Sequence, residues 1–168
     1  MSDRVEDQAW ERRVAEAWAT FDERTDGENR ALIETLAAEL PEGSAKASFV
    51  RACVLDSTGA SELAVPLYRE ALARGLGPER RRRAVIQLAS SLRNTGRADE
   101  SVALLAEELG GASDELDDAV RGFLALALTD VGREREAVSH ALAALAPYLP
   151  RYQRSLAAYA RDLVDGED

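Results

Sequence analysis

The stretch IQLASSLRNTGR, residues 86–97, holds the pattern that decides the fold of this chain. Leu88, Ala89 and Leu92 fall at helical spacing and form one apolar stripe. Gly96 follows four residues after Leu92, and glycine readily takes the left-handed conformation that ends a helix. The stretch therefore predicts a helix that stops at a tight turn.

The same arrangement recurs on both sides of this stretch. Three glycines, at positions 59, 96 and 132, are 37 and 36 residues apart, and apolar residues keep fixed distances from each of them. The recurring residues are Ala52, Ala89 and Ala125; Leu55, Leu92 and Leu128; Val65, Val102 and Val138; and Leu72, Leu109 and Leu145. A period of this length is typical of a solenoid. The sequence predicts an all-α solenoid of about four helical hairpins, with about nine helices and no strand.

We expect a single domain over residues 1–168. Its parts are an N-terminal helical hairpin at 1–43, three repeats at 45–146 and a C-terminal capping helix at 150–165. The expected helices are 3–21, a second one opening at Glu28 or Asn29 after an Asp26-Gly27 turn, 45–57, 61–74, one closing at Gly96, 98–109, one opening at Ser113 or Asp114, 134–145 and 151–164.

Three finer expectations accompany these boundaries. Ser61 can cap the helix 61–74, and Pro66 should bend that helix or delay its start. Leu126 adds a second apolar side to its helix, so we expect cover on both sides. Tyr152, Leu156 and Tyr159 belong to the apolar face of the last helix, which should cap the core.

Composition excludes some classes of partner and location. The net charge of −10 argues against a nucleic-acid or anionic-membrane partner, both of which need a basic footprint. The sequence holds no apolar run near the ~18 residues that span a bilayer, and its start does not read as a signal peptide. Cys53 is the only cysteine, so no intrachain disulfide can form, and a cytoplasmic setting fits.

The positions measured from each glycine resemble those of a tetratricopeptide repeat over residues 45–146. Small residues stand seven before and five after each glycine, the latter as Ala64, Ser101 and Ala137. Longer strings, among them residues 65–68, 86–97 and 123–128, are similar to a bacterial group of small, stand-alone tetratricopeptide proteins, group 5. The resemblance implies a right-handed helical-hairpin solenoid that binds proteins, has no catalytic residues and forms homodimers.

Two departures from the repeat pattern stand out. Arg51 and Glu108 occupy positions that are usually apolar or small, so we expect loose packing there. The lysine and asparagine clamp with which some tetratricopeptide proteins hold a C-terminal carboxylate is not reproduced, which argues against a ligand of that kind.

The resemblance also indicates where a peptide or protein partner would bind, because the first helix of each repeat lines the concave groove. The predicted groove residues are Lys46, Phe49, Cys53, Arg83, Ile86, Ser90, Arg93, Asn94, Leu126 and Asp130, with Gly122 beside them. Phe49 and Ile86 would be apolar anchors and Arg93 and Asn94 polar ones. The alternative for Arg93 is a structural ion pair with Asp130 on the next repeat.

Other candidate sites have ordinary structural explanations. Arg80 to Arg83 form the only basic cluster, and binding of a small anion or nucleotide through Arg83 and Arg93 is the alternative function. Paired or solvated arginines are the simpler interpretation of this run. The acidic run Asp114, Glu115, Asp117 and Asp118 suits a helix start better than a calcium loop.

We expect no metal site, no cofactor and no enzymatic activity. His140 is the only histidine, and Cys53 has no neighbour that would activate its thiol. Outside the repeats, Trp10, Trp18 and Phe21 form an aromatic group that either caps the solenoid or makes a dimer interface.

Overall fold

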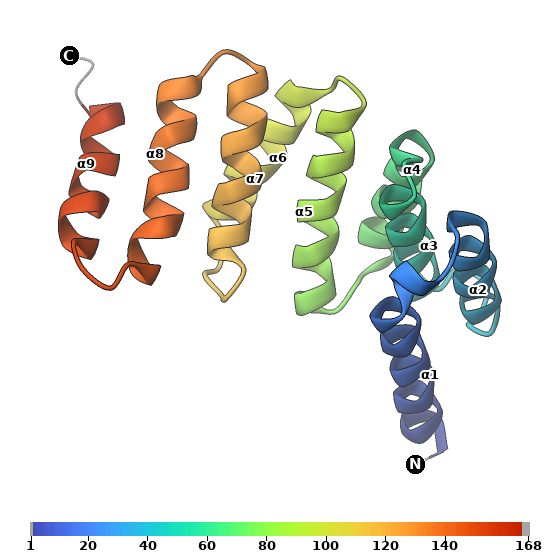
Figure 1. The fold of residues 1–168 in the computed structure, drawn as a ribbon. Helices are drawn as coiled ribbons and strands as arrows, with labels where there is room; N and C mark the ends of the chain where they lie inside the picture. Colours follow the sequence, from blue (N-terminus) through green and yellow to red (C-terminus); the bar gives the residue numbers. More distant parts are fainter. Residues whose placement is uncertain (1, 166–168) are drawn as a thin grey trace. The chain divides into compact units, whose positions relative to one another are not determined.

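The computed structural model describes residues 2–165, with side chains described from Asp7 onward. Within this range the chain is helical throughout and contains no strand, so the all-helical prediction is confirmed (Figure 1). The α-helices are α1 (Ser2–Ala19), α2 (Asp26–Ala38), α3 (Ala45–Ser57), α4 (Ser61–Arg74), α5 (Pro78–Asn94), α6 (Ala98–Leu109), α7 (Asp117–Asp130), α8 (Glu134–Leu145) and α9 (Gln153–Asp165). Two short 3₁₀ helices lie at Phe21–Glu23 and Ala146–Tyr148.

The helices gather into two compact units. Unit 1 covers residues 1–76 and contains α1 to α4, and unit 2 covers residues 77–168 and contains α5 to α9. Within each unit, helices that follow one another in the chain pack side by side. The organisation of the whole chain as a single domain stays a prediction.

The repeat period correctly predicted the helix ends near each turn glycine. Helices α3, α6 and α8 have the predicted bounds. Gly59, Gly96 and Gly132 have φ values of 78°, 77° and 75°, which is the left-handed conformation that the pattern required.

The predicted start of α2 was wrong. Thr25 caps α2, and its side chain accepts a hydrogen bond from the backbone N of Glu28, whose carboxylate in turn accepts one from the backbone N of Thr25 at 2.8 Å. This reciprocal capping box starts the helix at Asp26. Gly27 therefore lies in the first turn of α2 and makes no turn with Asp26.

One expectation for α4 also needs correction. Ala60, not Ser61, is the N-cap residue, and the Ser61 hydroxyl donates to Asp56 Oδ1 at 2.8 Å. Pro66 lies inside α4, which starts at Ser61 as predicted, so of the two effects expected of this proline the bend stays a prediction.

Helices α7 and α9 begin later than predicted. Ser113 and Asp114 form a loop in which the Ser113 hydroxyl donates to Asp117 Oδ2 at 2.5 Å, and α7 starts only at Asp117. Tyr152 has a φ of 69° and therefore stands outside α9, which begins at Gln153. Leu126 is 47% exposed, so the cover expected on the second apolar side of α7 is absent from the described residues.

The core of unit 2 is one apolar cluster shared by α5, α6, α7 and α8. Leu105, Val120 and Leu128 have no exposed surface, and Ala137 of α8 closes the cluster with 4% exposure. Leu109, Leu116 and Phe123 pack partly buried around it. This cluster holds the first helices α5 and α7 beside each other, which positions the surface described below.

The two residues expected to loosen the packing are instead paired. The Arg51 guanidinium donates to both carboxylate oxygens of Glu34 at 2.8 and 2.7 Å, which joins α3 to α2. The Glu108 carboxylate accepts two hydrogen bonds of 2.9 Å from Arg81 and is only 8% exposed. A charged residue at a repeat position therefore joins two helices when its partner has the opposite charge.

Candidate interaction surfaces

Four of the predicted groove residues lie on a surface formed by α5 and α7. We call this the first-helix surface of unit 2; it consists of Arg83, Ser90, Asn94 and Leu126. Ser90 and Leu126 are separated by 36 residues, the repeat period, so they occupy equivalent positions on two first helices that contact each other. Arg83, Asn94 and Leu126 are exposed and Ser90 is half-buried, so a ligand can reach this surface.

An ion pair borders this surface. Arg93 Nε lies 2.5 Å from Asp130 Oδ2, and Arg93 Nη2 donates to Oδ1 of the same carboxylate at 3.3 Å. Arg93 is on α5 and Asp130 is on α7, so the pair joins successive repeats. The structural alternative considered for Arg93 is therefore present in the molecule.

Three predicted groove residues are core residues. Ile86 is 6% exposed and belongs to the apolar cluster of unit 2. In unit 1, Phe49 is 3% exposed with its ring centroid 6.2 Å from that of Tyr68, and Cys53 is buried as a thiol outside any disulfide. Ile86 supports the first-helix surface from the core of unit 2, and none of the three side chains is accessible to a ligand.

Lys46, the last predicted groove residue, holds another helix of unit 1. Its ammonium lies 2.5 Å from Asp7 Oδ1 and 3.0 Å from Glu11 Oε1, both on α1, and 6.0 Å from the ring centroid of Trp10. Burial opposes ionisation, but the two carboxylates outweigh it and raise the pKa of Lys46. Lys46 of α3 thus binds two acidic residues of α1 in the same chain.

Two arginines of the run Arg80 to Arg83 form ion pairs and hydrogen bonds within unit 2. Arg82 is 4% exposed, its guanidinium donates to the backbone oxygen of Ala112, and Nη2 lies 2.5 Å from Asp117 Oδ1. Arg82 also lies 3.3 Å from Asp114 Oδ1. Arg81 pairs with Glu108, as described above. Two members of the run therefore join α5 to the end of α6 and the start of α7.

The same contacts explain part of the acidic run. The Ser113 hydroxyl, the backbone N of Asp114 and Arg82 together hold the pKa of Asp117 below its usual value. Asp118 accepts a hydrogen bond of 2.9 Å from the hydroxyl of Tyr148. Among residues 2–165 no three His, Cys, Asp or Glu side chains are grouped so that they could hold a metal ion.

The aromatic residues of the N-terminal hairpin differ in burial. Trp10 is 3% exposed, and its indole N–H donates to the backbone oxygen of Leu36 at 2.8 Å. Trp18 and Phe21 are half-buried and stack with their ring centroids 5.0 Å apart. Trp10 is thus a core residue of unit 1, and only the stacked pair presents surface.

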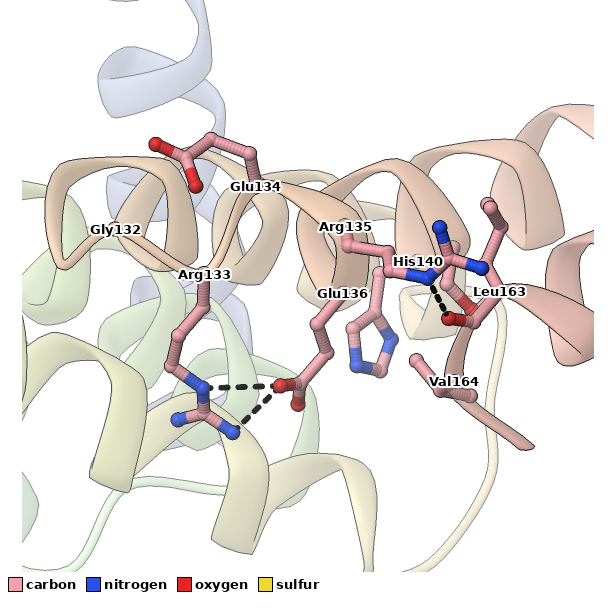
Figure 2. Close-up of a pocket in the computed structure, with 9 residues that line it drawn as sticks. Gly132, Arg133, Glu134, Arg135, Glu136, His140, Leu163 and Val164 are labelled. Carbon is pink, nitrogen blue, oxygen red and sulfur yellow. Dashed lines mark hydrogen bonds and ion pairs between the residues drawn. The ribbon is translucent and has the colours of Figure 1, made fainter. Parts of the chain in front are cut away.

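The sequence analysis missed an open pocket of about 610 Å³ between the start of α8 and the end of α9 (Figure 2). Figure 2 shows Arg133 and Glu136 paired on one side of His140, and Arg135 bonded to the backbone oxygen of Leu163 on the other. Burial lowers the pKa of His140, and Arg121 acts in the same direction. Only packing of α9 on α8 brings these residues together, so no local sequence signal could reveal the pocket.

The sequence profile of the tetratrico peptide repeat family matches residues 45–163. This match covers more than half of the chain, so the chain belongs to that family, as the repeated glycine pattern predicted. Domains of this family bind proteins and are generally not catalytic. No helix among residues 2–165 is long and apolar enough to cross a lipid bilayer.

Solved structures share the fold. A crystal structure of a Podosopora anserina protein, described as a kinesin light chain with nearly identical TPR-like repeats, has a TM-score of 0.68 to this chain. A variant of that protein has a TM-score of 0.69. Each is 18% identical, and each alignment covers 94% of this chain and 87% of the other. No curated protein matches the sequence significantly.

Proposed function

We propose that this chain is a non-enzymatic protein-interaction module that binds a peptide or a helix of a partner on the first-helix surface of unit 2 and also self-associates. The observation that carries the proposal is the exposure of Leu126, at 47%, between polar residues on the first helices of two repeats. An exposed apolar residue rimmed by polar groups is typical of a binding surface.

A contact within unit 1 indicates which chemical groups the ligand would carry. Lys46 binds Asp7 and Glu11, which are one helical turn apart on α1. Arg83 stands 37 residues after Lys46, at the equivalent position of α5. We therefore propose a ligand helix with two acidic residues one turn apart, held by Arg83 through charge-assisted hydrogen bonds.

The remaining residues of the surface complete the proposed contact. Leu126 would supply apolar burial, and Ser90 and Asn94 would bond polar groups of the ligand. Ile86 supports this surface from the core, where it is 6% exposed. The Arg93–Asp130 pair would hold α5 and α7 at the spacing that the ligand requires.

Selection of peptides from a random display library against the full chain tests this proposal. We expect selected peptides to carry paired acidic residues, and Leu126→Asp or Arg83→Glu should each weaken their binding, measured by calorimetry, by about tenfold or more. Leu63→Asp is the matched control, because Leu63 of α4 is also exposed, at 61%, but lies in unit 1. Equal binding by the Leu126 variant and the wild type would exclude the first-helix surface.

Binding of a small anion or nucleotide remains the alternative function, through Arg83 and Arg93. Because Asp130 already pairs with Arg93, an anion would have to displace that carboxylate.

The single buried cysteine fits the bacterial cytoplasm that we propose as the location. Self-association through the stacked Trp18 and Phe21 is one proposed route, and Trp10 would support that surface from the core.

A further inference from the structure

The pocket between α8 and α9 has no role in the proposed function, yet it has the size of a small-molecule site. Its volume is about 610 Å³, and sites for small ligands usually measure roughly 300–1,000 Å³. The start of α8 supplies charged and polar side chains, and the last turn of α9 supplies Leu163 and Val164. The pocket therefore combines charged groups with an apolar wall.

One repeat earlier, the equivalent positions pack in or around the core. Val164 stands 36 residues after Leu128, which has no exposed surface, whereas Val164 is 42% exposed. His140 stands 36 residues after Leu104, which packs against the core cluster of unit 2. At this place an imidazole thus stands where the preceding repeat has a packed leucine, and the space beside it is open.

Arg135 brings an uncompensated positive charge to this pocket. Its Nε donates to the backbone oxygen of Leu163 at 2.6 Å, and it forms no ion pair with a carboxylate among residues 2–165. Glu134 also lines the pocket, but Figure 2 shows its carboxylate pointing away from the other charged side chains. Because a backbone carbonyl carries no net charge, the guanidinium of Arg135 can still attract an anion.

Arg133 is paired, but only through part of its guanidinium. Its Nε donates to Glu136 Oε2 at 2.9 Å, and its Nη2 lies 2.6 Å from the same oxygen. A guanidinium has further N–H groups on Nη1, and no residue that the structure describes accepts from them. An anion can therefore bind Arg133 without displacing Glu136.

The imidazole of His140 lies between these two arginines (Figure 2) and is half-buried. In the described part of the chain no group forms a hydrogen bond with it. Burial lowers the pKa of His140, as do Arg121 of α7 and Arg133, and only Glu136 opposes them. The described lining from α9 carries no charge. The surroundings thus disfavour a further positive charge at the imidazole, and an anion bound beside it would reverse this effect.

We propose that this pocket binds a carboxylate attached to a short apolar chain. The carboxylate would lie beside His140 and accept hydrogen bonds from Arg133 and Arg135, while the chain would contact Leu163 and Val164. Guanidinium groups suit a planar acceptor with two oxygens, and the apolar wall favours a hydrocarbon part over an inorganic anion. This site lies on α8 and α9, so it is separate from the surface of α5 and α7 that would bind a partner.

Titration of His140 by NMR tests the proposal, because the only histidine of the chain gives a single set of imidazole signals. At constant ionic strength we expect hexanoate to raise the pKa of His140 by about 0.5 or more. Hexanol carries a similar chain without the charge and should leave that pKa unchanged. If hexanoate also leaves it unchanged, the proposal is wrong.

The affinity for hexanoate should depend on pH. Because protonated His140 attracts the carboxylate, the wild type should bind hexanoate several-fold more tightly at about pH 5.5 than at about pH 7.5, where the ligand is ionised throughout. His140→Gln should bind it equally at the two pH values, as measured by calorimetry. The same pH dependence in this variant would overturn the placement of the carboxylate beside His140.

Arginine variants locate the site. Arg133→Gln and Arg135→Gln should each weaken hexanoate binding by about fivefold or more, since each removes a charged donor. Arg97→Gln is the matched control, because Arg97 stands 36 residues before Arg133 and pairs with Glu100 at the same spacing, but does not line this pocket. An equal loss in the control would indicate a general effect of charge and would overturn the assignment.

Three further probes define the ligand. Acetate lacks most of the chain and should bind about tenfold more weakly than hexanoate. Inorganic phosphate that binds more tightly than hexanoate would contradict the apolar contact with Val164. A peptide that ends in a free leucine carboxylate distinguishes two sources of this chemistry: tighter binding than hexanoate assigns the pocket to the end of a protein chain, and weaker binding assigns it to a free organic acid. Either of these two results supports a carboxylate on an apolar chain.

Discussion

The Arg82 guanidinium lies 2.5 Å from the carboxylate of Asp117, the first residue of the opening helix of the next repeat. Arg82 is buried, although it belongs to a run of four arginines. From the sequence alone such a run is expected to be solvated or to bind an anionic ligand. Its contacts join the start of α5 to the loop between α6 and α7, where no apolar residue could satisfy the backbone oxygen of Ala112.

We expect Arg82→Ala to reduce the free energy of unfolding by about 3 kcal/mol, because it removes a buried guanidinium that binds Asp117 and the backbone oxygen of Ala112. Arg83→Ala, in the same run but exposed, should change it by less than about 0.5 kcal/mol. Urea denaturation of both variants provides the measurement. Equal stability of the two would contradict the role assigned to Arg82.

The Arg93–Asp130 pair gives a second prediction. Both side chains are about one-third exposed, so a double-mutant cycle with Arg93→Ala and Asp130→Ala should give a coupling energy of about 0.2–1 kcal/mol. Raising the salt concentration should reduce this coupling. A coupling energy of zero would show that the pair does not join the repeats, and Arg93 would then be available to a ligand.

Two glycines of unit 2 should respond to alanine with opposite signs. Gly96→Ala should destabilise the fold by about 1 kcal/mol, because Gly96 has a φ of 77°, which alanine adopts only with strain. Gly122→Ala should stabilise it by about 0.5–1 kcal/mol, since Gly122 lies inside α7 and nothing lies within 4 Å of an added Cβ. Thermal denaturation distinguishes the two, and the same sign for both would contradict this assignment.

The half-buried position of His140 predicts that stability depends on pH. Its folded pKa is lowered, so the unfolded chain binds the proton more readily, and the contribution of His140 to stability is lost as pH falls below about 6.5. His140→Gln should therefore lose less unfolding free energy than the wild type between about pH 7.5 and pH 5. Urea denaturation at the two pH values is the measurement, and identical losses would argue against this effect.

The sequence could predict the features that depend on neighbours within a few residues. The repeated glycines and the stripes before them predicted α3, α6 and α8 to the residue, because left-handed glycines and helical apolar stripes are local signals. Prediction failed at α2, where the capping box of Thr25 and Glu28 sets the start, and at α7, where Ser113 and Asp114 lie in a loop before the helix. The capping-box residues are present in the sequence, but the polar residues nearby are equally able to start a helix.

The candidate sites could not be predicted for a different reason: the exposure of a side chain depends on contacts between residues that are distant in the sequence. Ile86 and Phe49 were predicted as ligand anchors, yet both are buried, since a position on the first helix does not state which helices pack over it. The tyrosines near the end of the chain were predicted to cap the core, yet Tyr159 is exposed, because no helix among residues 2–165 covers its side of α9. Periodicity thus determined the helices and their order, whereas long-range packing and charge pairing decided which side chains remain available to a partner.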